Sequence, residues 1–181
     1  MKNVILHLNN LNMILYFIGF MGVGKTTIGK QMAAYHNYNF IDTDRKIEEI
    51  AGKNISDIFE EDGERYFRQR ESSILKEIPP KNIVSCGGGL PIYNNNMKFI
   101  KDSGVSIYLK ASEESIFDRL SKKPNNRPLI LNKSKEKLRK FIKSKLRERE
   151  GIYLKADYII ETSNLSEKDV LRKVNTLHLP L

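Results

Sequence analysis

The chain has 181 residues, 40% of them apolar and 29% charged, which is typical of a soluble globular protein and sufficient for one domain with a sizeable core. The single cysteine, Cys86, excludes an intramolecular disulfide and suits a reducing, cytoplasmic setting. The apolar N-terminal run is interrupted by His7 and several asparagines, which argues against a membrane span. Met13 follows that run, so residues 1–12 are either a dispensable extension or the result of an upstream start.

The net charge of +9 is concentrated in one segment. Between Arg119 and Arg149 the sequence holds thirteen Lys or Arg and two Glu, a local balance of +11. The other residues hold 18 basic and 20 acidic side chains, a balance of −2. The segment is a nucleic-acid-binding patch, a solvated helix face, or a segment that closes over an anionic substrate. The order of the motifs described below favours the third interpretation.

Short apolar runs alternate with helical patterns along the chain. The apolar runs predict five strands. Four of them cover residues 14–18, 82–86, 105–109 and 158–160, and the remaining one, the second along the chain, ends at Ile41. Helical spacing follows each run, with Gly52 as a helix stop and Ser56, Ser112 and Ser166 as helix caps. This alternation predicts an α/β fold, a three-layer sandwich with a five-stranded parallel sheet, in which ligands bind at the carboxyl ends of the strands.

The stretch GFMGVGKTT, residues 19–27, matches the phosphate-loop pattern G-x4-G-K-[ST] between a strand and a helix. Its glycines allow backbone N–H groups to turn around phosphates, and the helix N-terminus adds its positive dipole end. We expect Lys25 to reach the β- and γ-phosphates and the Thr26 hydroxyl to bind Mg²⁺. The expected nucleotide-binding residues of the loop are Gly22, Val23, Gly24, Lys25, Thr26 and Thr27.

Asp42 and Asp44 follow the second predicted strand. If the strand conformation continues, the two side chains share a face and both reach the site. One carboxylate would then hold the metal through water, and the other would accept a proton from an attacking hydroxyl group. The alternative is that Asp44 caps the next helix.

The run from Gly63 to Glu71 places Glu64, Arg68 and Glu71 at helical i, i+4, i+7 spacing. An Arg fork held between glutamates suits a substrate carboxylate better than Lys does. Taken alone, the run favours a surface ion-pair ladder, which contributes little to stability.

Gly87, Gly88 and Gly89 directly follow the third predicted strand. Three glycines cost conformational entropy, so either another group approaches the backbone closely there or the segment is a flexible turn. Cys86, just before them, is interpreted as a small strand residue and not as a nucleophile.

Residues 122–132 are rich in proline and asparagine and contain Arg127. Such a loop with one arginine suggests a mobile lid, at about residues 121–135, that carries a charge-neutralising side chain. Arg149 is a further candidate, although most basic residues of this segment are expected simply to be solvated.

In their order, these motifs resemble the shikimate kinase family, within the nucleoside-monophosphate-kinase-like group of phosphate-loop proteins. The resembling stretches run from about Met13 to Thr162 and are GFMGVGKTT, DTD, IFEEDGERYFRQRE, SCGGG, NNRPL and REREGIYLKADYIIET. The resemblance implies transfer of the ATP γ-phosphate to the 3-hydroxyl of shikimate, with Mg²⁺ as cofactor.

The resemblance also implies roles for single residues. Lys25, Asp44 and Arg127 match catalytic positions, with Asp44 as the candidate base and Arg127 as the lid arginine near the phosphates. Thr26 and Asp42 match metal positions, and Arg119 is similar to an arginine near adenine. The implied acceptor-binding residues are Asp44, Arg68, Gly88, Gly89 and Arg149, where the arginines bind the carboxylate and the glycines form a shelf beside the ring. The sequence departs from the family at Lys122 and Lys123, where the family often has arginine.

Three alternatives are weighed against this interpretation. Another small-molecule kinase of the same group, such as a gluconate kinase, should lack the Phe67-Arg68 run paired with three glycines. A regulatory GTPase should have an N-K-x-D motif, but Asn132-Lys133 continues with Ser-Lys. A nucleic-acid-binding protein should bind DNA or RNA with a strong salt dependence. We expect a single kinase domain, 1–181, with a substrate-binding subregion at about 42–78, that binds ATP and shikimate as a cytoplasmic monomer without nucleic acid or membrane.

Overall fold

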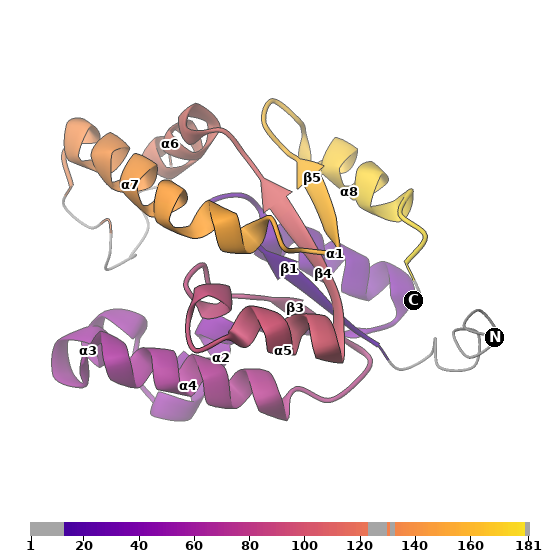
Figure 1. Cartoon of the computed structure of the whole chain (residues 1–181), viewed down its shortest axis with the longest axis horizontal. Helices are drawn as coiled ribbons and strands as arrows, with labels where there is room; N and C mark the ends of the chain where they lie inside the picture. Colours follow the sequence, from indigo (N-terminus) through magenta and orange to yellow (C-terminus); the bar gives the residue numbers. More distant parts are fainter. Residues whose placement is uncertain (1–12, 123–129, 131–132, 180–181) are drawn as a thin grey trace.

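The computed structural model describes residues 13–122, 130 and 133–179. At its centre is one sheet of parallel strands in the order β2-β3-β1-β4-β5, with helices packed on both faces (Figure 1). The strands are β1 (Ile14–Ile18), β2 (Asn39–Asp42), β3 (Asn82–Ser85), β4 (Gly104–Lys110) and β5 (Tyr158–Glu161). The helices are α1 (Lys25–His36), α2 (Thr43–Ala51), α3 (Ile55–Glu61), α4 (Gly63–Glu77), the 3₁₀ turn η2 (Leu90–Ile92), α5 (Asn96–Ser103), α6 (Glu113–Lys122), α7 (Lys135–Tyr153) and α8 (Glu167–Asn175). The predicted α/β fold is confirmed.

The central strand β1 explains the three layers. Side chains alternate between the two faces of a strand. Leu15 and Phe17 join one hydrophobic core with α1 and α8, whereas Ile14, Tyr16 and Ile18 join a second core with α4 and α5. All five side chains are buried, which is why this strand is an unbroken apolar run and not an alternating one.

The helix ends follow short local signals. Ser112 and Ser166 each accept a hydrogen bond from the backbone N–H three residues further on, and Gly52 ends α2 with a left-handed φ of 67°, as predicted. The prediction of Ser56 as a cap is wrong, because Asn54 caps α3 and Ser56 lies inside the helix. No helix in the described ranges is long and apolar enough to cross a membrane.

The sheet order brings three predicted motifs together. Ser85, at the end of β3, pairs with Phe17 of β1 on one side and with Asp42 of β2 on the other. The phosphate loop after β1, the acidic pair around the end of β2 and the glycines after β3 therefore start at adjacent carboxyl ends. A single edge of the sheet can collect donor and acceptor groups that lie far apart in the sequence.

Asp157 joins the start of β5 to the buried Ser106 of β4. Its Oδ2 accepts hydrogen bonds from the Ser106 N–H at 2.9 Å and from the Ser106 hydroxyl at 2.6 Å. Partial burial raises the pKa of Asp157, but these bonds, with Lys101 nearby, outweigh burial and hold the pKa below its ordinary value of 3.8. The carboxylate therefore stabilises the fold above that value, and the contribution is lost as the pH falls through the lowered pKa.

We expect Asp157→Ala to lower the free energy of unfolding at pH 7 by about 1 to 3 kcal/mol, because it leaves the buried Ser106 N–H without a partner. Denaturant unfolding of both proteins from pH 7 to pH 3 measures this, and the difference should shrink below about pH 4. Asp102→Ala is the control, since Asp102 forms an exposed ion pair with Lys98. A loss no larger than the loss in Asp102→Ala would contradict the prediction.

Candidate active site

The phosphate loop leads directly into α1. Gly24 is the N-cap residue with a φ of 98°, a left-handed conformation that favours glycine. Lys25 is buried, and its Nζ donates hydrogen bonds of 2.9 Å to the carbonyl oxygens of Gly19 and Phe20. The lysine thus lies across its own loop, with its charge beside the first turn of α1, where the helix dipole favours an anion.

Asp42 links the phosphate loop to α2. Its Oδ2 accepts a hydrogen bond of 2.7 Å from the Thr26 hydroxyl, whose oxygen also lies 3.2 Å from Ser85 Oγ. Its Oδ1 accepts from the N–H of Asp44 at 3.2 Å and so caps α2. Asp42, and not Asp44, is therefore the N-cap. Because this cap starts a helix at Thr43, the strand does not continue to Asp44, and the condition for a shared strand face is not met.

Both carboxylates nevertheless reach the site. Asp42 and Asp44 both line the same cavity, although Asp44 lies in the first turn of α2 and not on a strand. In that position the carboxylate also interacts favourably with the positive end of the α2 dipole.

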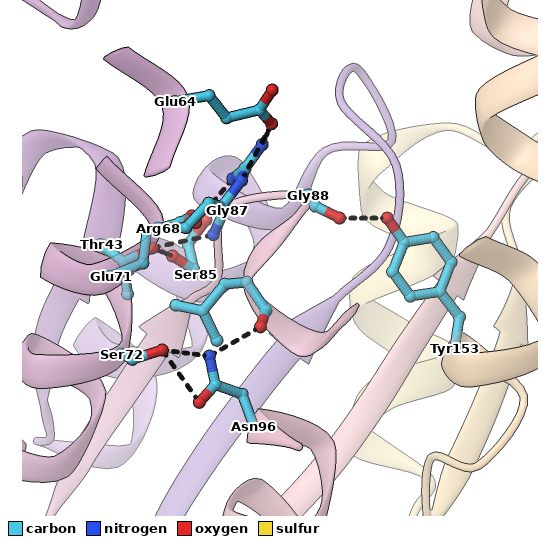
Figure 2. A network of polar contacts seen from close by, with 11 residues as sticks. Thr43, Glu64, Arg68, Glu71, Ser72, Ser85, Gly87, Gly88, Asn96 and Tyr153 are labelled. Carbon is cyan, nitrogen blue, oxygen red and sulfur yellow. Dashed lines mark hydrogen bonds and ion pairs between the residues drawn. The ribbon is translucent and has the colours of Figure 1, made fainter. Parts of the chain in front are cut away.

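Arg68 forms a cluster with a buried glutamate and an exposed one. The Arg68 Nη1 lies 2.6 Å from Glu71 Oε2, and Nη2 lies 2.9 Å from Glu64 Oε1 (Figure 2). Arg68 is 9% exposed and Glu71 is fully buried, while Glu64 is open to solvent. The interpretation of this run as a surface ladder is therefore wrong, because α4 turns this face toward the end of β3.

The glycines after β3 permit this burial. A Cβ atom at Gly89 would collide with the Arg68 guanidinium, and one at Gly87 would collide with Glu71 Oε1 and Asp44 Oδ1. Close approach of other groups, and not flexibility, is thus the reason for two of the three glycines. Two carboxylates and one guanidinium are packed directly against the backbone of this segment.

Burial changes the proton affinity of Glu71. Desolvation and the charge of Asp44 raise the pKa of Glu71 to about 7, while Arg68 lowers it. Within the described residues, Glu71 Oε1 has no hydrogen-bond partner. Glu71 therefore contacts the Arg68 guanidinium through Oε2, beside the contact from Glu64, and its Oε1 lies against Gly87.

Arg149 approaches the same glycines from α7. It is 5% exposed, and its guanidinium lies 5.9 Å from the centre of the Phe20 ring. Its Nη1 would be 3.5 Å from a Cβ atom at Gly88. Arg68 and Arg149, on helices far apart in the sequence, therefore both lie beside the glycine segment.

Arg119 belongs to another part of the site. It lies in α6, and its Nη2 donates a hydrogen bond of 2.6 Å to the carbonyl oxygen of Thr162, just after β5. This bond holds the guanidinium at the wall of the cavity, which Leu120 and Val170 also line.

One cavity of about 690 Å³ unites these groups. It is lined by every predicted site residue that the structure describes, namely Gly22, Val23, Gly24, Lys25, Thr26, Thr27, Asp42, Asp44, Arg68, Gly88, Gly89, Arg119 and Arg149. Arg127 and most of the predicted lid lie outside the described residues, as do residues 1–12.

Several polar residues of the site were not predicted from the sequence. Thr43 is fully buried, and its Oγ1 accepts a hydrogen bond of 2.8 Å from the Gly87 N–H. Tyr153 donates to the Gly88 carbonyl oxygen (Figure 2). Ser85 Oγ lies 3.2 Å from the Thr26 hydroxyl oxygen. All three lie in quoted motifs (DTD, SCGGG and REREGIYLKADYIIET), but the motifs gave no signal for these contacts, because the contacts depend on the tertiary structure.

Comparisons with known proteins agree with this geometry. The model of the family described as shikimate kinase matches residues 21–178. A shikimate kinase from Thermodesulfovibrio yellowstonii is 40% identical over 176 residues, which cover 96% of this chain and 93% of the relative. The solved structure of shikimate kinase from Acinetobacter baumannii in complex with shikimate has a TM-score of 0.84 at 31% identity and covers 94% of both chains.

A more distant structural likeness concerns the gluconate kinase alternative. A gluconokinase from Sinorhizobium meliloti is 14% identical, with a TM-score of 0.56 over 90% of this chain and 89% of its own, and so shares only the fold. Because the family model spans most of the sequence and the Thermodesulfovibrio relative matches nearly all of it, the chain belongs to the shikimate kinase family.

Proposed function

We propose that the chain transfers the γ-phosphate of ATP to the 3-hydroxyl group of shikimate, which gives shikimate 3-phosphate and ADP for aromatic amino acid synthesis. The observation that carries this proposal is one cavity shared by a phosphate loop, a carboxylate and two buried guanidinium groups. Binding of a nucleotide alone does not require the guanidinium pair beside Gly88 and Gly89. An acceptor that carries its own carboxylate does require such a pair of guanidinium groups.

The phosphate-loop end of the cavity would position the phosphates of ATP and neutralise their charge. Lys25 would exchange its bonds to loop carbonyls for bonds to the β- and γ-phosphates, and the N–H groups of residues 22–27 would surround them. Phosphoryl transfer depends mainly on such positioning and on stabilisation of the negative charge. Arg119, held at the cavity wall by Thr162, suits the base side of the nucleotide.

The acceptor end fits a small cyclic alcohol with a carboxylate. Arg68 and Arg149 would bind the carboxylate, because guanidinium forks match its two oxygens. Gly88 and Gly89 form a backbone wall without side chains, against which a ring can lie. Asp44 lines the same cavity and would accept the proton of the attacking hydroxyl group.

Thr26 and Asp42 suit a Mg²⁺ ion that arrives with ATP. Their oxygens are 2.7 Å apart, and hard oxygen donors are what Mg²⁺ prefers. In the part of the chain that the structure describes, no group of three His, Cys, Asp or Glu could enclose a metal ion, which fits an ion shared with phosphate oxygens. We infer that Thr26 binds the ion directly and Asp42 through water. The ion would neutralise charge on the β- and γ-phosphates.

From the sequence alone, we also infer a lid at about residues 121–135, in which Arg127 is the arginine near the phosphates. We also infer one kinase domain with an acceptor-binding subregion at about 42–78. The monomeric state and the cytoplasmic location stay predictions.

The function is tested by ADP release with shikimate, gluconate and quinate as acceptors in parallel. We expect turnover with shikimate, and we expect Lys25→Ala to lower kcat at least about 10²-fold because the transferred charge loses its cation. Lys30→Ala, an exposed position on the same helix, is the control. Faster turnover with gluconate than with shikimate would favour a gluconate kinase, and near-normal kcat in Lys25→Ala would reject the role of Lys25.

Arg68→Ala should weaken shikimate binding at least about 30-fold, because a buried charged contact to the carboxylate is lost. The Kd for an ATP analogue should stay within about twofold, since Arg68 lies on the glycine side of the cavity. Calorimetry with each ligand measures both constants, and thermal unfolding checks the fold. Arg70→Ala is the matched control, because Arg70 is exposed on the same helix. An equal loss for both ligands would contradict the assignment.

Thr26→Val should raise the Mg²⁺ concentration needed for half-maximal activity by about tenfold or more, because the valine has no hydroxyl group to bind the ion. Thr26→Ser retains the hydroxyl and should stay close to the unmodified protein. Titration of Mg²⁺ at saturating ATP and shikimate measures this. The inference would be wrong if valine and serine gave the same Mg²⁺ dependence.

A further inference from the structure

The backbone of the glycine segment is held by side chains from three different helices. The Gly87 N–H donates to Thr43 of α2, and the Gly88 carbonyl oxygen accepts from Tyr153 of α7 at 2.5 Å. Directly after the glycines, the Leu90 carbonyl oxygen accepts from Asn96 of α5 at 2.9 Å. The cavity wall formed by the glycines is therefore built into the fold before any ligand binds, as an organised binding site requires.

Like α2, which carries Asp44 beside Thr43, the helix of Tyr153 also carries a cavity residue. Arg149 lies four residues earlier on α7, so the two side chains share one face of the helix. The Tyr153 ring is fully buried against Tyr108 of β4, with ring centres 5.1 Å apart. Arg149 lies beside Gly88, and the Tyr153 hydroxyl binds the carbonyl oxygen of Gly88.

The ring and the hydroxyl group have separable effects. The ring packs the end of α7 onto the sheet whether or not it carries an oxygen. The hydroxyl adds a directional contact between α7 and the glycine segment, across 65 positions of sequence. Burial raises the pKa of Tyr153 to about 12, so the hydroxyl remains a donor at neutral pH.

We propose that Tyr153 is a positioning residue of the acceptor site, whose hydroxyl group sets Arg149 relative to the shelf of Gly88 and Gly89. This inference rests on the proposed function. A guanidinium that binds a carboxylate in a fork depends on its position, and a displacement of about 1 Å can cost up to about 10²-fold in rate. The phosphate loop is held by separate contacts. The loss of the Tyr153 hydroxyl group should therefore leave nucleotide binding unchanged.

The test is Tyr153→Phe, which keeps the ring and removes only the hydroxyl group. We expect the KM for shikimate to rise about tenfold, with the KM for ATP and kcat within about twofold. Tyr16→Phe is the matched control. Tyr16 is also fully buried, and its hydroxyl lies 3.0 Å from Ser103 Oγ, at the amino end of β4 and away from the glycines. Both variants should lose similar thermal stability, and only Tyr153→Phe should change the KM for shikimate.

A second comparison tests whether Tyr153 affects shikimate binding through the position of Arg149. In an Arg149→Gln background, Tyr153→Phe should change the calorimetric Kd for shikimate by less than about twofold, because residues that act together are not additive. A tenfold effect that persists in that background would overturn the inference. So would an unchanged KM for shikimate in Tyr153→Phe, equal rises for both substrates, or the same rise in Tyr16→Phe. The unmodified protein is assayed alongside, and if it fails to turn over shikimate, the proposed function fails and not the inference about Tyr153 alone.

Discussion

The structure of this site depends on the burial of the Arg68 guanidinium against a backbone that has no side chains. A buried charge is costly unless it is paired and hydrogen-bonded. Glu71 supplies that pair, and Gly87 and Gly89 supply the room, since any Cβ atom there would collide with the charged groups. The cation is thus fixed in a position where a second anion, the carboxylate of an acceptor, can meet it.

The two halves of the cavity are built differently, and in the proposed function they bind differently charged groups. The phosphate loop uses backbone N–H groups, a helix dipole and one lysine, all within nine consecutive residues. The acceptor half uses side chains from α2, α4 and α7 that meet only at the glycine segment. The first half is local in the sequence, and the second exists only when the sheet and its helices have assembled.

The basic segment has a mixed role. In α7, Leu138, Ile142 and Leu146 face the core, while residues such as Lys140 are exposed. Within the described residues, Arg119, Lys122 and Arg149 of this segment line the cavity. Among the described residues of this segment, the basic groups that line the cavity thus lie at its two ends, and others such as Lys140 are solvated, as expected for single positions.

Local periodicity in the sequence was enough to predict the fold class, and a contiguous motif was enough to predict the phosphate loop. The motifs together with the family resemblance also predicted part of the cavity lining, although not Glu71 or Ser85. The sequence was misleading at Asp42 and Arg68, where local patterns suggested a continued strand and a surface ladder. It contained almost no signal for the contacts of Thr43 and Tyr153. Those contacts join residues 44 and 65 positions apart, and only the packing of parallel strands and their helices decides which buried hydroxyl group meets which carbonyl or N–H.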